Sequence, residues 1–392
     1  SSLFFAMGGR AGVCLRGDDD GFEEETEHRS PVTQKNCSDG LKGYVAWSAS
    51  EMQGWRESME DAHVTIASLR DAVTVSHMSE TSTVDNGWSN VGLFGVFDGH
   101  GGFQVAKFCE RHLPEAIASR PSSNIGTAMS EAFVEMDQLL KDPLGLRELK
   151  RLTALAKTSS RRTRRFRGSA EGIGSTAVLC CVTPSCLVVA NCGDSRAVLC
   201  RGGHAIDLSQ DHKPSLPEER ARIEEAGGWV QHGAVPRVNG DLSLSRALGD
   251  LEYKDDKLPP ENHIVSAVPE VRSVARTPQD EFLLLACDGI WDVLSSQAAV
   301  DFVRHQLGDS NSWGWRIATG KLKASEILSQ LLDHCLSPDL ASTAGLGGDN
   351  MTVVLVLFLP VLPTPHPGFK AAKMHWCSEP VMPLRSRLLE AN

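Results

Sequence analysis

The segment from residue 175 to residue 209 constrains the fold most, because it holds several apolar runs joined by very short connections. The runs are rich in Val, Leu, Ala and Cys, and the turns between them are Thr-Pro-Ser, Cys-Gly-Asp-Ser and Arg-Gly-Gly. A parallel pair of strands needs a long crossover, whereas a short connection joins antiparallel neighbours. We therefore expect an antiparallel meander here and not a series of βαβ units.

Two segments have the periodicity of amphipathic helices. In 127–140 the apolar residues fall on one helical face, and they are Met129, Ala132, Phe133, Met136 and Leu140. In 104–118 a second stripe consists of Val105, Phe108, His112 and Ala116. His112 is interpreted as a half-buried structural residue and not as a ligand. Helices together with antiparallel strands predict a layered α+β fold.

Composition limits the class of protein. The 392 residues are 41% hydrophobic and 23% charged, with a formal net charge of −11, which argues against general binding to nucleic acid. The longest apolar run, Met351 to Leu359, is about half of what a membrane span requires and ends at Pro360. The cysteine count is odd, at eleven, and lacks any C-x-x-C pair. Free thiols in a reducing compartment, cytoplasmic or nuclear, are therefore expected.

Changes in composition along the sequence indicate how the chain is organised. Residues 1–42 are polar and acidic and are predicted to form a flexible extension, followed by a strand-rich body over 43–360 and a C-terminal extension over 361–392. Three stretches interrupt the body and are expected to be loops, at 70–90, 141–168 and 308–320. The second is strongly basic, ending in an arginine cluster within 161–167. It is interpreted as a solvated loop or as a surface for acidic or phosphorylated partners.

Four predicted strands carry an aspartate beside a glycine at one end. In LFGVFDGHGG (93–102) a buried strand ends at Asp98, and the other three aspartates are Asp194, Asp288 and Asp349. A single Asp-Gly pair is usually a turn. If all four strand ends meet, however, the carboxylates crowd together and require cations. Ligand sets made only of oxygen favour Mg²⁺ or Mn²⁺ over Zn²⁺.

A short upstream segment adds a positive charge to this acidic set. GWRESMEDAH (54–63) contains Arg56 together with Glu60 and Asp61. An arginine whose fork matches phosphate oxygens, beside acids that can hold metal-bound waters, suits a phosphate-ester site. Cys287, in contrast, lies in an apolar run and is interpreted as a small hydrophobic core residue.

Together these stretches resemble the metal-dependent protein phosphatase family, protein phosphatase 2C, in the family's order over 43–360. The matching motifs are GWRESMEDAH, FGVFDGHGG, GSTAVL, NCGDSRAVL, QDHKP, RVNGDLSLSRALGD, ACDGIWDVL and GGDNMTVVLV. The resemblance implies a four-layer αββα sandwich, with two central antiparallel sheets flanked by helices. It also identifies 210–240 as the variable flap, in which a helix is expected to begin at Pro217 and end before Gly227.

The resemblance also implies roles for individual residues. Asp98 would bridge two metal ions, Gly99 would offer its carbonyl to one of them, and Asp288 and Asp349 would hold the other. Glu60 and Asp61 would act mostly through metal-bound waters. Asp194 and Asp292 match acids associated with a weaker third metal. The role of Thr176 in GSTAVL stays open.

The expected function is that of a protein serine/threonine phosphatase dependent on Mg²⁺ or Mn²⁺, acting on phosphorylated proteins as a monomer. A bridging water would attack phosphorus directly, Arg56 would hold the phosphate, and His100 would protonate the leaving alkoxide. A haloacid-dehalogenase-type phosphatase also has an aspartate at the end of a strand, but it requires a second aspartate two residues further on. That position is His100 in this chain, so the sequence does not fit this class. The alternative from another class is a silent pseudophosphatase acting as a scaffold, which is expected to lack one or more metal acids.

Overall fold

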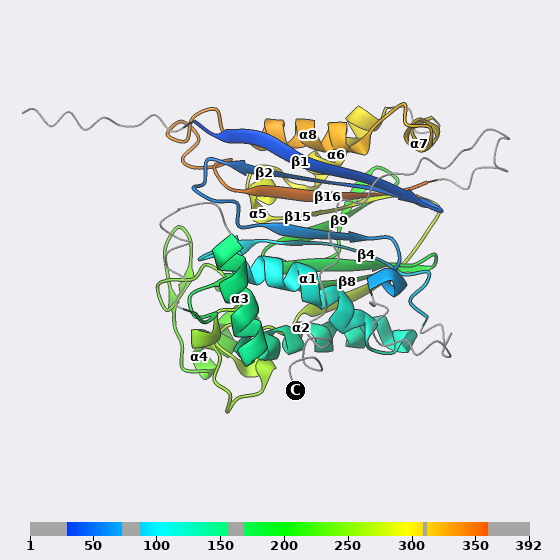
Figure 1. Ribbon diagram of the computed structural model, residues 1–392. Helices are drawn as coiled ribbons and strands as arrows, with labels where there is room; N and C mark the ends of the chain where they lie inside the picture. The colour runs from blue at the N-terminus through cyan, green and yellow to red at the C-terminus, as the bar shows by residue number, and fades with distance from the viewer. Residues whose placement is uncertain (1–29, 73–86, 156–167, 309–311, 360–392) are drawn as a thin grey trace, which may run out of the picture. The chain divides into compact units, whose positions relative to one another are not determined.

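Two antiparallel β-sheets lie face to face, and helices cover the outer face of each sheet (Figure 1). The computed structural model describes residues 30–72, 87–155, 168–308 and 312–359. The expected four-layer αββα sandwich is confirmed. None of the helices in these described segments has the length and apolar character needed to span a bilayer.

The first sheet has six strands and is covered by the C-terminal helices. In spatial order its strands are β1 (Val32–Lys42), β2 (Val45–Gly54), β16 (Met351–Phe358), β15 (Asp280–Ala286), β9 (Arg196–Arg201) and β10 (His204–Asp207). The helices beside it are α5 (Asp288–Trp291), α6 (Ser296–Leu307), α7 (Trp313–Ala318) and α8 (Ala324–Cys335). All four contribute buried side chains to one apolar cluster with this sheet.

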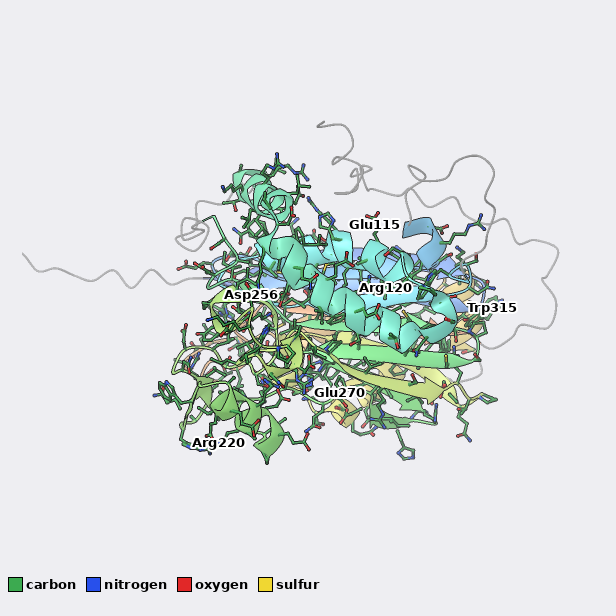
Figure 2. All side chains as sticks on the ribbon, turned by 90° about the horizontal axis from the view of Figure 1, so that it is seen from below. Glu115, Arg120, Arg220, Asp256, Glu270 and Trp315 are labelled. Carbon is green, nitrogen blue, oxygen red and sulfur yellow. The ribbon has the colours of Figure 1, made fainter. Side chains whose placement is uncertain are left out.

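The second sheet has five strands and is covered by helices from the N-terminal half. Its order is β14 (Glu270–Ala275), β8 (Cys186–Cys192), β7 (Ala177–Val182), β4 (Gly92–Phe97) and β3 (Ala62–Ile66). Three helices pack on it, α1 (Gln104–Ala118), α2 (Ile125–Lys141) and α3 (Pro143–Leu155). Arg120 lies just after α1 (Figure 2). It pairs with Glu131 and Glu135 of α2.

The apolar residues that the periodicity singled out form the core beneath α1 and α2. Met129, Phe133 and Met136 are fully buried, which confirms the helix predicted over 127–140. His112 is also buried, and its ring lies 4.4 Å from that of Phe108, as centroids. Between the sheets, strand residues interdigitate in a separate apolar cluster, which fixes the spacing of the two layers.

Several smaller elements complete the fold. A three-stranded ladder consists of β13 (Leu248–Gly249), β6 (Gly174–Ser175) and β5 (Gly99–His100). The segment 210–240, expected to be the flap, contains α4 (Pro217–Glu225) and the pair β11 (Val230–Gln231) and β12 (Arg237–Val238). Single 3₁₀ turns are η1 (Leu69–Ala72), η3 (Ser122–Asn124), η5 (Leu251–Tyr253) and η6 (Pro260–Asn262). The helix expected from Pro217 to before Gly227 is confirmed.

The meander expected over 175–209 is wrong at one link. Strand β7 pairs with β8, and β9 pairs with β10, but β8 and β9 belong to different sheets. Residues 193–195 therefore carry the chain from one sheet to the other. Three residues can span about 10 Å, which is the spacing of stacked sheets. A short connection thus permits a change of layer as well as a hairpin.

Three expected boundaries also need correction. Residues 32–42, assigned to the flexible extension, form β1, a polar and mostly exposed edge strand without an apolar alternation. Within 141–168, residues 143–155 form α3 because Leu149 and Leu152 bury against the core below α1. Within 308–320, α7 forms around the buried Trp313. The arginine cluster at 161–167, most of 70–90 and the extension at 361–392 lie outside the described residues.

Candidate active site

A cavity of about 650 Å³ opens where strand ends of both sheets meet. Asp98 follows β4 in the five-stranded sheet, and Asp288 follows β15 in the six-stranded sheet. Asp194 stands at the link that changes sheets after β8. One carboxylate oxygen from each of these three aspartates lies within 4.8 Å of the others. Three of the four strand ends with an Asp-Gly pair therefore meet, which is the condition under which cations were expected.

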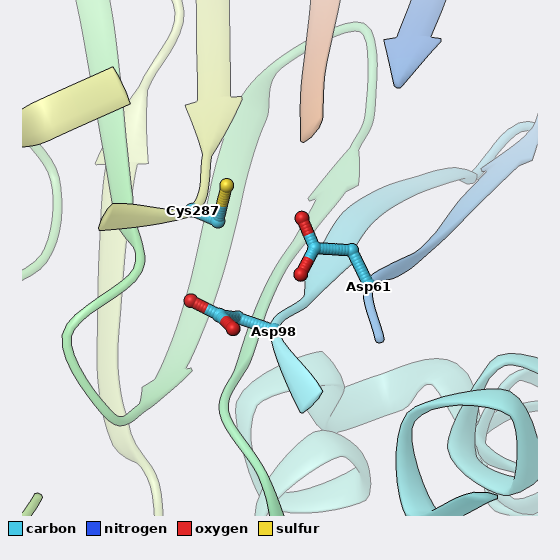
Figure 3. A group of neighbouring side chains, drawn as sticks. All are labelled: Asp61, Asp98 and Cys287. Carbon is cyan, nitrogen blue, oxygen red and sulfur yellow. The ribbon is translucent and has the colours of Figure 1, made fainter. Parts of the chain in front are cut away.

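The structure brings most of the predicted site residues to this cavity. Those that line it are Arg56, Glu60, Asp98, Gly99, His100, Asp194, Asp288 and Asp349. Asp61 is buried beside Asp98, with a carboxylate oxygen within 4.8 Å of one on Asp98 (Figure 3). Asp292 is exposed and lines a neighbouring cavity of about 250 Å³ together with Arg56 and Asp349.

The backbone of Asp98 is held in place by Thr176, whose role the sequence left open. The Thr176 N–H donates to the Asp98 carbonyl at 2.9 Å, and the Asp98 N–H donates to Thr176 Oγ1 at 3.1 Å. At Gly99 the backbone passes so close to its neighbour that a Cβ would stand 2.3 Å from the Glu60 carbonyl oxygen. Only glycine allows this approach, so Thr176 and Gly99 together fix where Asp98 projects.

Asn350 holds the segment around Glu60 against the start of β16. The Glu60 N–H donates to Asn350 Oδ1 at 2.9 Å, and Asn350 Nδ2 donates to the Ser58 carbonyl at 3.0 Å. The Ser58 hydroxyl in turn donates to Glu60 Oε1 at 2.7 Å. The two bonds of Asn350 join segments almost three hundred positions apart in the sequence. They hold the upstream acids close to Asp349, the residue before Asn350.

The crowding of the acids changes their ionisation. Burial first, and then the neighbouring carboxylates, raise the pKa of Asp98 and the pKa of Asp288 well above the ordinary value. Burial likewise raises the pKa of Asp61 to about 7. Neither carboxylate oxygen of Asp61 has a hydrogen-bond partner. Carboxylates this crowded and this poorly satisfied are suited to divalent cations with oxygen ligands.

Two basic side chains of the chain itself pair with members of the acidic set. Arg56 pairs with Asp349, and Lys213 pairs with Asp194. Burial disfavours the Lys213 ammonium, but Asp194 more than offsets this and raises the pKa of Lys213. Sequence reasoning missed Lys213, although QDHKP was among the motifs that carried the resemblance. A lysine directly after a histidine carries no local pattern that predicts a carboxylate partner.

His100 has a buried carboxylate partner that the sequence analysis also missed. Its Nε2 lies 2.7 Å from Asp250 Oδ2, and Asp250 is only 2% exposed. Burial disfavours the His100 imidazolium, but Asp250 more than offsets this and raises the pKa of His100. Asp250 has a left-handed backbone with φ of 47°, and the preceding Gly249 N–H donates to Asp137 Oδ1 at 2.8 Å. The only signal in the sequence was Asp250 ending the motif RVNGDLSLSRALGD.

Comparison with known proteins identifies relatives of the whole described body of the chain. The family model for protein phosphatase 2C matches residues 45–343. A probable protein phosphatase 2C 60 of Arabidopsis thaliana is 38% identical, over 84% of this chain and 90% of its own length. Protein phosphatase 2C homolog 2 of Schizosaccharomyces pombe is 40% identical, over 84% of this chain and 77% of its own length. The fold is similar to a crystal structure of a phosphatase from a pathogenic strain of Toxoplasma gondii, with a TM-score of 0.59 and 24% identity, over 83% and 96% of the two chains.

The αββα sandwich, with an acidic cavity at its strand ends that could hold a metal ion, is consistent with the phosphatases found in these comparisons. The chain belongs to the protein phosphatase 2C family. It is accordingly a protein serine/threonine phosphatase by family, and its substrates are phosphorylated proteins.

Proposed function

We propose that this chain hydrolyses phosphoserine and phosphothreonine in proteins with the help of Mg²⁺ or Mn²⁺, without a covalent phospho-enzyme. The observation that carries the proposal is the meeting of carboxylates from both sheets in one cavity beside Arg56 and His100. A phosphate monoester needs charge neutralisation, an activated water and a proton for the leaving group. Each requirement has a matching group in this cavity.

The acidic residues would hold the cations. Asp98, Gly99, Asp288 and Asp349 are proposed for a pair of ions, with Glu60 and Asp61 acting through waters. Asp194 and Asp292 are proposed for a weaker third ion, beside Lys213, which pairs with Asp194. Such cations, when bound, neutralise phosphoryl oxygens and activate water for attack.

Arg56 is proposed to bind the phosphate group. Its guanidinium is 44% exposed, lies at the cavity and pairs with Asp349 through Nη2. A guanidinium has five N–H donors in a planar fork, so it can contact phosphate oxygens in addition to this carboxylate. Arg56 would thereby fix the phosphorus atom above the acidic set and hold the leaving oxygen toward His100.

His100 is proposed to protonate the departing alkoxide. Its Nε2 faces Asp250, whose carboxylate favours the imidazolium and fixes the ring. The raised pKa keeps a proton available near neutral pH, which is the condition for a general acid. Asp250 itself is too deeply buried to donate to substrate and serves to position His100.

A catalytically silent scaffold is expected to lack one or more of the acids that would hold metal. Every predicted acid is present, so nothing in the site supports this alternative. We further propose action as a monomer in the cytoplasm or nucleus. The nine cysteines in the described parts of the chain are free thiols, which supports a reducing compartment.

The test is hydrolysis of a phosphothreonine peptide with millimolar Mn²⁺ or Mg²⁺, repeated in excess EDTA. Turnover is expected only with the cations, and the Asp98→Asn variant is expected to lack it. Asp333→Asn is the matched control, because that aspartate is 58% exposed on the far helix α8 and should retain full turnover. Full activity in excess EDTA would disprove the metal requirement.

A further inference from the structure

Helix α2 carries a carboxylate on the face that it buries. Asp137 lies one turn after Phe133 and is 7% exposed, whereas the other buried residues of α2 are apolar. The helix covers the five-stranded sheet with this face (Figure 1). A buried charge is costly unless it is paired and hydrogen-bonded. No step of the proposed hydrolysis uses Asp137, so its burial has another reason.

The partner of Asp137 is a buried lysine from the far end of the sequence motif that contains Asp250. Lys254 Nζ donates to Asp137 Oδ2, and also to the Ala247 carbonyl at 2.8 Å. The Lys254 side chain is 0% exposed. Replacing a buried ion pair by apolar side chains of similar volume is often neutral or stabilising. Stability alone therefore does not explain why the chain places these two charges here.

Both side chains hold the short strand β13, which ends directly before Asp250. Asp137 Oδ1 accepts the N–H of Gly249, the last residue of β13, at 2.8 Å. Lys254 binds the carbonyl of Ala247, the residue that precedes β13. A strand of two residues has few ladder bonds of its own. The ion pair therefore fixes β13 at both of its ends.

The ladder that contains β13 also carries His100, and it leaves little room for movement. Gly174 in β6 is paired with Gly249 on one side and with His100 on the other. A Cβ at Gly174 would stand 2.5 Å from His100 Nε2 and closer still to Asp250 Oδ2. Hydrogen bonds weaken steeply as their geometry departs from the optimum. A shift of β13 would therefore disturb the contact between Asp250 and His100.

We propose that Asp137 and Lys254 are positioning residues for His100. They fix β13, β13 sets the position of Asp250, and the Asp250 carboxylate orients the His100 ring. Neither Asp137 nor Lys254 lines the cavity, so neither contacts substrate. The consequence for turnover rests on the proposed function, because it requires His100 to protonate the leaving group. The placement of the ring does not depend on that function.

The first test replaces both charges together, as Asp137→Leu with Lys254→Met, so that no buried charge is left unpaired. In this double variant kcat for a phosphothreonine peptide should fall roughly 10–100-fold at unchanged KM, since a displacement of about 1 Å can cost a factor of this size. The loss on p-nitrophenyl phosphate should be much smaller. Glu148→Leu is the matched control, because Glu148 is another paired carboxylate, 5% exposed, on α3. It should keep the wild-type ratio of the two rates. Equal losses on both substrates in the double variant, or no loss, would overturn the proposal.

Two further variants keep the proposal testable in case the double variant folds poorly. Asp137→Asn with Lys254→Met retains an oxygen that can accept the Gly249 N–H, so it should turn over the peptide faster than the double variant does. In a chain that already carries His100→Ala, the double substitution should cause no additional loss on the peptide, because residues that act through one group are not additive. An equally slow Asp137→Asn protein, or an additional loss without His100, would contradict the assigned role.

Proton NMR of the full chain in Mg²⁺ measures the ring without turnover. His100 Nε2 lies 2.7 Å from the Asp250 carboxylate, which can accept its proton in a hydrogen bond. The low-field signal of this N–H is assigned by its loss in His100→Ala. It should be lost or displaced in the double variant and retained in Glu148→Leu. A signal absent from wild type, or unchanged in the double variant, would overturn the proposal. A signal that depends on the ion pair in a chain that hydrolyses no phosphopeptide would support this placement while refuting the proposed function.

Discussion

At the scale of single residues, the site depends on pairs that lie far apart in the sequence. His100 and Asp250 are 150 positions apart, and Arg56 and Asp349 are 293 apart. Four of the acids were predictable because each stands beside glycine at the end of an apolar strand, and they are Asp98, Asp194, Asp288 and Asp349. The partners Lys213 and Asp250 were not predictable, because they come close to Asp194 and His100 only in the folded chain. Residue type and local pattern identify a ligand more readily than they identify what positions it.

His100→Ala tests the role of His100 as general acid. Turnover of a phosphothreonine peptide should fall by roughly 10²–10⁴, the usual range for such a group. The loss on p-nitrophenyl phosphate should be much smaller, because p-nitrophenolate leaves without needing a proton. Steady-state rates on both substrates measure the difference. Equal losses on both would mean that His100 positions ligands or water instead.

Asp250→Asn tests the carboxylate behind His100. The folded-state pKa of His100 is raised because Asp250 more than offsets burial, so the protonated acid persists to higher pH. Removing the charge should lower the pKa of His100, and the decline of peptide turnover at alkaline pH should begin at lower pH. A profile of kcat against pH for both proteins measures this. An alkaline limb that coincides in the two proteins would contradict the assigned pairing.

At the scale of elements, buried strands and amphipathic helices followed from periodicity, but polar edges and changes of layer did not. The run Leu93–Phe97 predicted β4 because it is apolar on both faces. Strand β1 is polar and exposed, so its pairing with β2 had no apolar signature. Helix α3 was not predicted because its sequence is strongly charged. Its Glu148 is buried nevertheless, because it pairs with Arg111 and Arg151. The link after β8 was missed because hairpins and sheet changes can use connections of equal length.

The link between β8 and β9, at residues 193–195, is stabilised by a neutral histidine. His212 donates its backbone N–H to the Gly193 carbonyl at 3.0 Å, and its Nδ1 accepts the Gly193 N–H at 3.2 Å. Burial, followed by the charge of Arg246, lowers the pKa of His212 to about 4. The unfolded chain binds the proton first as pH falls, so this stability is complete above pH 6.5 and is lost on the way down to pH 4.

Acidification should therefore expose the contribution of His212 to the free energy of unfolding. Between pH 6.5 and 4 we expect wild type to lose on the order of 1–3 kcal/mol that His212→Gln does not lose. Urea unfolding at several pH values, taken as the difference between the two proteins, separates this group from the other titrating residues. Parallel pH dependence in both proteins would show that His212 is not buried in its neutral form.

At the scale of the whole molecule, two sheets that share one apolar interior place their negative charges at one common end. The interior of the sandwich is apolar and holds β4 against β15 and β16, so the strand ends cannot separate to relieve repulsion. The metal-free fold therefore carries a cost at its site, visible in the raised pKa values of Asp98 and Asp288, for which burial is the first cause and mutual repulsion the next. The carboxylates of Asp98 and Asp288, which are proposed to be needed for activity, therefore lower the stability of the chain without metal.

Asp288→Asn should reverse the order of stability depending on whether metal is present. The folded pKa of Asp288 is raised above its unfolded value, so its ionised form costs stability at pH 7–8 and the cost declines as pH falls. In excess EDTA at pH 7.5 the variant is expected to unfold at a higher temperature than wild type. With Mn²⁺ at a hundred times its Kd, wild type should gain about 2.7 kcal/mol, whereas the variant gains less and has no turnover.

The control for that experiment is Asp256→Asn, at a position labelled in Figure 2. It removes an equal charge from an aspartate that is 82% exposed, pairs with Lys141 and does not line the cavity. Its unfolding temperature should match wild type in both conditions, since a fully exposed ion pair contributes little to stability. If Asp288→Asn instead unfolds below wild type in EDTA, the carboxylate stabilises the metal-free fold. The crowded acids would then be satisfied by Lys213 and Arg56 alone, and the strand ends would need no cation to stay together.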